Sequence, residues 1–101
     1  MASVDSLTAA KAAGTSAAIV CAGTAEITIG IYVDNNLPFS ERVGAIVQIS
    51  NPEGYADFFR DGRVVVLTES NPVISIRQAG TYQVKKPATE ALIGVFSDVG
   101  A

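Results

Sequence analysis

Asp57 and Asp61 are the two carboxylates in this sequence whose spacing is best suited to acid–base chemistry. A glycoside hydrolase needs two such groups held on either side of a cleft. These two flank a short turn beside Arg60 and Arg63, and a β-rich chain of 101 residues rarely encloses a cleft of that kind. We therefore favour surface ion pairing over catalysis for this group.

A second cluster of oxygen ligands occurs in Asp34-Asn35-Asn36, as a calcium site would need. The same three residues suit a tight turn, because Asp and Asn tolerate left-handed backbone. We favour the turn. Glu53 and Glu90 fall in predicted turns where the sequence offers them no partner, so no metal site is predicted.

Histidine is absent from the sequence, and cysteine occurs once, as Cys21 in an apolar run. Transition-metal sites and Ser-His-Asp or Cys-His triads need residues that this composition does not supply. Cys21 has no base to activate it and is expected to be a small buried thiol. The lack of a disulfide framework fits folding in a reducing cytosol. We predict a protein that is not an enzyme and that uses no cofactor.

The charge balance argues against nucleic acid as a partner. The net charge is −3, charged residues make up 17% of the chain, and Lys85-Lys86 is the only basic pair, which we interpret as a solvated strand end. No run approaches the roughly 18 apolar residues of a membrane span, and the N-terminus does not resemble a secretory signal. So little charge on so small a chain suggests that subunit contacts cover part of its surface.

Alternating apolar and polar residues predict a chain made almost entirely of strands. Residues 1–15, rich in Ala, Ser and Thr, are expected to form an extended or partly helical N-terminal arm, mobile unless a partner holds it. Residues 16–101 form a single domain, with Asp61-Gly62 as a two-residue hairpin turn and Pro87 closing a strand. The predicted strands are 17–22, 26–33, 43–50, 55–59, 64–68, 73–77, 81–86 and 91–97. About eight short strands with regular turns predict an all-β antiparallel β-sandwich, either jelly-roll-like or immunoglobulin-like.

Three of these strands are apolar on both faces, where an antiparallel sandwich should keep one face wet. They are residues 45–47, 64–67 and 91–96. Such faces suggest packing on other subunits of a homo-oligomer. In the last strand, Gly94 leaves room for close packing. The covering surface is either the N-terminal arm or another copy of the chain, and we favour another copy.

Several large apolar residues are candidates for oligomer or partner contacts. Phe58 and Phe59 point to opposite faces of one strand, so one ring should enter the core and the other should not. Leu37 and Phe39 lie in a loop, where apolar residues are often contact residues. The full set of contact candidates is Leu37, Phe39, Phe58, Phe59, Leu92 and Phe96.

The order of these segments resembles small β-rich virion proteins of tailed bacteriophages, above all capsid decoration or cement proteins. The resemblance is carried by Gly80-Thr81-Tyr82, by the strand that ends in Lys86-Pro87, and by Ile93-Gly94-Val95 after it. It spans roughly residues 14–98. It implies a non-enzymatic structural protein of the virion, assembled in the host cytoplasm. Such a protein forms a homotrimer that binds the major capsid protein and stabilises the capsid.

The alternative is a receptor- or carbohydrate-binding module of a phage tail or head fibre. Such a module would use Tyr32, Tyr55 or Phe39 as a stacking platform.

Overall fold

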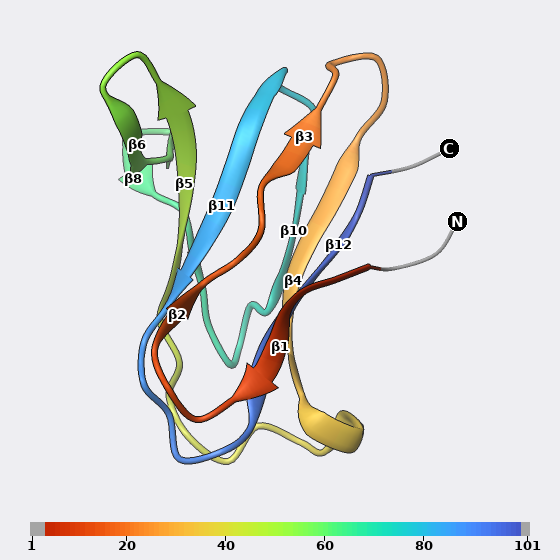
Figure 1. Ribbon diagram of the computed structural model, residues 1–101, viewed down its shortest axis with the longest axis vertical. Helices are drawn as coiled ribbons and strands as arrows, with labels where there is room; N and C mark the ends of the chain where they lie inside the picture. Colours follow the sequence, from red (N-terminus) through yellow and green to blue (C-terminus); the bar gives the residue numbers. More distant parts are fainter. Residues whose placement is uncertain (1–3, 100–101) are drawn as a thin grey trace.

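The alternating segments form two antiparallel sheets in a computed structural model that describes residues 4–99 (Figure 1). The first sheet has four strands in the order β1-β12-β4-β10. These are Val4–Ala10 (β1), Ile93–Asp98 (β12), Ile27–Val33 (β4) and Val73–Ile76 (β10). Every neighbouring pair in this sheet is antiparallel.

The second sheet has the order β2-β11-β5-β6, with β3 also pairing with β11 and β9 also pairing with β5. Its strands are Gly14–Thr15 (β2), Ile19–Cys21 (β3), Ala45–Asn51 (β5), Gly54–Asp57 (β6), Val66–Leu67 (β9) and Gly80–Lys86 (β11). A separate hairpin, Phe59–Arg60 (β7) and Arg63–Val64 (β8), projects between β6 and β9. The predicted all-β antiparallel sandwich is confirmed.

One hydrophobic core lies between the two sheets. Ile27, Ile29, Ile31 and Val33 alternate along β4, and all four side chains are buried, because every second residue of a strand faces the same side. From the other sheet, the ring of Tyr82 meets the ring of Phe58 edge to face at 5.2 Å. The Tyr82 hydroxyl donates a hydrogen bond to the Gln78 carbonyl (2.7 Å), which satisfies its one polar group.

The turns predicted at Asp61-Gly62 and at Asp34-Asn35-Asn36 are both present. Asp61 and Gly62 both have positive φ, 55° and 79°, as a two-residue hairpin between β7 and β8 requires. Asp34–Asn36 forms a single 3₁₀ turn (η1), with Asn35 and Asn36 at φ 60° and 54°. The turn interpretation of this segment is confirmed.

The segment that the sequence analysis set apart as an N-terminal arm is built into both sheets over its described part. β1 pairs with β12, β2 pairs with β11, and neither is helical. The physical reason is that β12 would otherwise expose a row of unpaired backbone groups at its edge. Leu7 packs against the core, and the hydroxyls of Ser6 and Ser97 lie 2.7 Å apart.

Lys86 is buried, so the interpretation of Lys85-Lys86 as a solvated strand end is wrong for its second residue. Lys86 lies on the same face of β11 as Tyr82 and Val84, and only 2% of it is exposed. Its ammonium donates hydrogen bonds to the carbonyls of Ala12 (2.8 Å) and Pro87 (3.1 Å). Burial lowers the pKa of Lys86, and the negative charge of Glu41 partly opposes that shift.

Candidate functional site

Two aromatic rings lie on the outer face of the first sheet, where solvated polar residues are usual in a sandwich. Tyr32 on β4 stands opposite Gly94 on β12, and Phe96 on β12 stands opposite Gly30 on β4. The two ring centroids are 6.3 Å apart with the planes tilted by 54°. Each ring therefore covers a glycine on the neighbouring strand. We call Tyr32, Phe96 and the flanking Val73, which stands opposite Gly30, the aromatic face.

The glycines are necessary for this arrangement. A Cβ on Gly94 would lie 2.6 Å from the Leu7 carbonyl oxygen and 2.8 Å from the Tyr32 ring, and a Cβ on Gly30 would overlap the Phe96 ring. The space at Gly94 is thus filled by β1 and Tyr32 of the same chain. At this position the expectation that another copy of the chain packs against the last strand is wrong.

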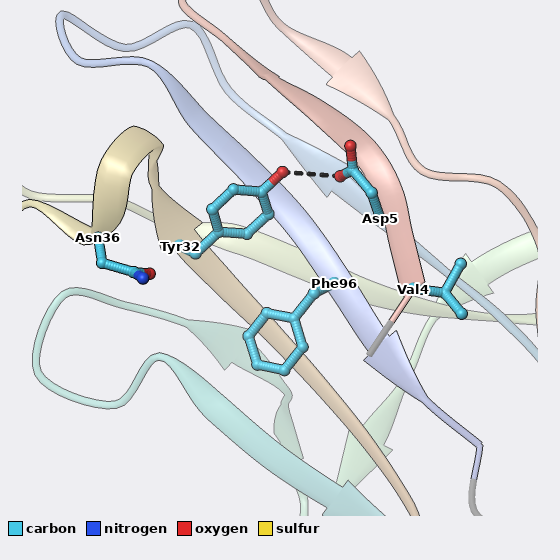
Figure 2. Close-up of a pocket in the computed structure, with 5 residues that line it drawn as sticks. All are labelled: Val4, Asp5, Tyr32, Asn36 and Phe96. Carbon is cyan, nitrogen blue, oxygen red and sulfur yellow. Dashed lines mark hydrogen bonds between the residues drawn. The ribbon is translucent and has the colours of Figure 1, made fainter. Parts of the chain in front are cut away.

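A carboxylate borders the aromatic face. The Tyr32 hydroxyl donates a 2.7 Å hydrogen bond to Asp5 Oδ1 (Figure 2). Burial, that hydrogen bond and the negative charge of Asp5 raise the pKa of Tyr32 to about 12. Tyr32 therefore stays a neutral donor throughout the physiological pH range.

These groups line a shallow, open hollow of about 370 Å³. Figure 2 shows Asn36, at the end of η1, on one side of Tyr32, with Val4 and Asp5 of β1 beyond β12 on the other. Ring faces flanked by a carboxylate and an amide can stack on a flat apolar surface while the polar groups bind hydroxyls or backbone. Sequence reasoning missed Asp5, Asn36, Val4 and Val73. The one available signal was the placement of aromatic residues and glycines two positions apart in both β4 and β12.

The predicted contact residues are distributed over several parts of the fold. Leu37 and Phe59 are each 60% exposed, and Leu92 is also exposed. Leu37 and Leu92 flank the same turn, because the N–H of Asp34 donates to the Leu92 carbonyl. Phe96 belongs to the aromatic face.

The other two contact candidates face inward. Phe39 packs against the core, and Phe58 lies within it. The prediction that one ring of Phe58-Phe59 enters the core and the other does not is confirmed. Phe58 is therefore not accessible to a partner.

Asp57, one of the two aspartates considered for acid–base chemistry, takes part in a network of polar side chains. Asp57 Oδ1 accepts a hydrogen bond from Gln48 Nε2 (3.1 Å), and Gln48 in turn accepts one from Gln83 (2.7 Å). This ladder of polar side chains crosses three strands on the outer face of the second sheet. Arg60 donates to the Ser75 carbonyl (3.0 Å) and lies over the Phe58 ring. Within residues 4–99, no group of three His, Cys, Asp or Glu side chains gathers as a metal site requires.

The two outer faces of the sandwich thus differ in kind. The second sheet presents the amide and carboxylate ladder, with Tyr55 exposed near its edge, whereas the first presents aromatic rings, valines and glycines.

Over the part of the chain that the structure describes, no helix is long and apolar enough to span a bilayer. No protein-family model matches this sequence, and no curated protein or solved structure is significantly similar to it.

Proposed function

We propose that this protein is a non-enzymatic structural protein that works as a homo-oligomer on a larger protein shell. The observation that carries the proposal is the aromatic face. Val73 is 43% exposed and flanks the half-buried rings of Tyr32 and Phe96 on the outer face of the first sheet. Contiguous apolar patches on small proteins usually mark a contact with another protein.

The strand order supports a jelly roll as the fold behind this function. The sheet β1-β12-β4-β10 packs against the sheet β2-β11-β5-β6, in which β3 shares the position of β2 beside β11 and β9 shares the position of β6 beside β5. Most connections along the chain therefore cross from one sheet to the other. A jelly roll has eight strands in two Greek keys, an architecture used by viral capsid proteins and lectins. Fold alone does not assign function, so this is support by analogy.

The resemblance to phage decoration proteins supplies the finer parts of the proposal. On that basis the oligomer is a trimer, the partner is the major capsid protein, and the protein is part of the virion. The aromatic face would then provide the contact between copies or with the shell, and the polar ladder on the second sheet would remain in solvent.

Sedimentation velocity at micromolar concentration tests the proposal. We expect an oligomer, and we expect Val73→Glu to dissociate it, because the new charge would be buried against the rings of the aromatic face. Val20→Glu is the matched control, since Val20 is 60% exposed on the other sheet. A stable wild-type monomer that does not bind purified phage capsids would contradict the proposal.

The hollow in Figure 2 favours a second candidate, a carbohydrate-binding module. Tyr32 and Phe96 offer ring faces for a sugar, and Asp5 and Asn36 offer hydrogen-bonding groups beside them. A glycan array would test this. Binding that Asn36→Ala abolishes and Tyr55→Ala leaves unchanged would favour it over the assembly role, and an array with no hits would exclude it.

A further inference from the structure

One edge of the first sheet has no strand beside it within residues 4–99. β10 is the last strand on that side, paired only with β4. The opposite edge, β1, is different: its pairing with β12 is interrupted by register shifts, and the Ser6 carbonyl accepts a hydrogen bond from the Ala17 N–H (2.8 Å). Bulges and covering segments of that kind protect a sheet edge from further pairing. The β10 edge therefore stands out as the accessible one.

The register of β10 shows which backbone groups face outward. The N–H of Ile31 donates to the Pro72 carbonyl opposite it (2.9 Å), so this pair is a hydrogen-bonded one. Opposed residues of antiparallel strands alternate between bonded and non-bonded pairs. Ile74 and Ile76 therefore bond to β4, while the N–H and C=O groups of Val73 and Ser75 point away from it. The hydrogen bond from Arg60 to the Ser75 carbonyl confirms that direction.

A groove of about 710 Å³ lies along this edge, between β10 and the β7–β8 hairpin. Its apolar lining comes from Val64, Val65, Val73 and Ile74, of which Val65 and Ile74 also pack against the core. Its polar lining comes from Arg60, Asp61, Arg63, Asn71 and Ser75. Two guanidinium groups against one carboxylate give the groove a positive charge on a chain whose net charge is −3.

We propose that this groove binds an extended acidic segment of a partner protein, which adds to the first sheet as a fifth strand beside β10. The segment's backbone pairs with Val73 and Ser75, and one of its carboxylates binds Arg60 and Arg63. Main-chain hydrogen bonds supply affinity in this mode of recognition, and side-chain pockets supply specificity. Arg60 is positioned to exchange its bond to the Ser75 carbonyl for a bond to that carboxylate, because guanidinium groups bind carboxylates in a two-pronged geometry.

Strand addition deepens the proposed function, because it specifies how this chain would hold a protein of the shell. The identity of that partner rests on the proposed function. Strand addition uses the backbone edge of β10, whereas the proposed oligomer contact uses side chains of the aromatic face around Tyr32 and Phe96. Val73 contributes its backbone to the first contact and its side chain to the second. Peptide binding at the groove and sedimentation of the oligomer are separate measurements. Either can fail without the other.

Amide hydrogen exchange measured by NMR on the free protein is the first test. We expect the amides of Val73 and Ser75 to exchange at least about tenfold faster than those of Ile74 and Ile76, because only the latter two bond to β4. If Val73 and Ser75 are as well protected as their neighbours, the edge is already covered and the proposal is wrong.

The second test is titration with an acetylated, amidated hexapeptide of alternating threonine and valine that carries one glutamate. We expect it to slow exchange at Val73 and Ser75. Versions with glutamine or lysine in place of glutamate should bind about tenfold or more weakly, the loss expected for one charge-assisted interaction. If no version binds at millimolar concentration, or if the lysine version binds equally well, the proposal is overturned.

Variants locate the binding. Arg60→Gln with Arg63→Gln should remove the preference for glutamate, while Arg77→Gln, an exposed arginine outside the groove, should not. Ser75→Pro should abolish binding without removing a bond to β4, because the Ser75 N–H points outward. Should that variant fail to fold, a peptide with N-methyl groups on alternate residues tests the same point from the ligand's side. Such a peptide can be methylated on its odd or on its even residues. If both versions bind as tightly as the unmethylated peptide, the proposal is overturned.

Discussion

The Phe96 ring on β12 covers Gly30 on β4, the residue directly opposite it. Tyr32 stands in the reciprocal relationship to Gly94 on the same pair of strands. Aromatic side chains often compensate for glycine in a sheet by covering the backbone that the missing side chain exposes. The outer face of the first sheet is therefore a tightly packed layer of rings on backbone.

Gly30→Ala should destabilise the protein by about 1–3 kcal/mol, because the added methyl group overlaps the Phe96 ring and forces it off the sheet. Urea unfolding followed by circular dichroism measures the change. Gly44→Ala is the matched control: its Cβ would lie 3.8 Å from the nearest Val66 methyl, an ordinary contact. The control should change stability by no more than about 1 kcal/mol, in the stabilising direction. Equal effects of the two variants would mean that the ring does not need the space.

Lys86→Ala should cost about 2–4 kcal/mol of unfolding free energy. The variant loses the buried aliphatic stem and leaves the carbonyls of Ala12 and Pro87 without their donor. Lys85→Ala removes the same kind of side chain from the exposed face of the same strand and should stay within about 0.5 kcal/mol of wild type. Thermal unfolding at pH 7 compares the two. A similar midpoint for both variants would argue that the Lys86 ammonium is solvated.

Glu41 should make stability depend on pH in the acid range. Its carboxylate accepts hydrogen bonds from the N–H groups of Ala91 (2.8 Å) and Glu90 (2.9 Å), and these lower its pKa below the usual 4.5. The contribution of the Glu41 carboxylate to the free energy of unfolding is therefore complete above about pH 4.5. It is lost as the pH falls through the lower pKa that Glu41 has in the folded state.

Between pH 7 and pH 3, the free energy of unfolding should consequently fall less for Glu41→Gln than for wild type. At pH 7 the variant should have the lower free energy of unfolding. Chemical unfolding at a series of pH values measures this. Glu53→Gln, in the exposed turn between β5 and β6, is the control and should follow the wild-type curve. Parallel curves for Glu41→Gln and wild type would show that the carboxylate does not hold the loop in solution. Glu69, which accepts from the Val43 N–H, shares the same direction of pKa shift.

Asp5→Asn should lower the pKa of Tyr32 from about 12 toward, but not to, the ordinary value of 10, because burial remains when the negative charge is gone. Alkaline titration of tyrosine absorbance, with Tyr32→Phe to assign the signal, measures the shift. Since the folded-state pKa is raised, the stabilising contribution of Tyr32 is complete below pH 10 and is lost as the pH rises toward 12. An unchanged titration would mean that the Asp5–Tyr32 bond is absent in solution.

Most of the local structure could be predicted from residue patterns. The alternation in residues 26–33 predicted a strand there, and Asp61-Gly62 predicted the hairpin turn, because both depend only on near neighbours in the chain. The N-terminal segment was harder. Its Ala, Ser and Thr residues carry a weak pattern, and it forms β1 only because the edge of β12 is available.

The sequence by itself determined that the chain is an all-β sandwich, since turn residues and a period of two are local properties. The sequence also lacks histidine, which the usual catalytic triads require. Only the tertiary structure decided that Phe96 meets Gly30 and that Asp5 meets Tyr32. It also decided that no strand among residues 4–99 covers the outer edge of β10. These facts depend on strand order and register, which follow from how two whole sheets bury their inner faces against each other. A shift of one residue would exchange the two faces of a strand, so no single segment contains the answer.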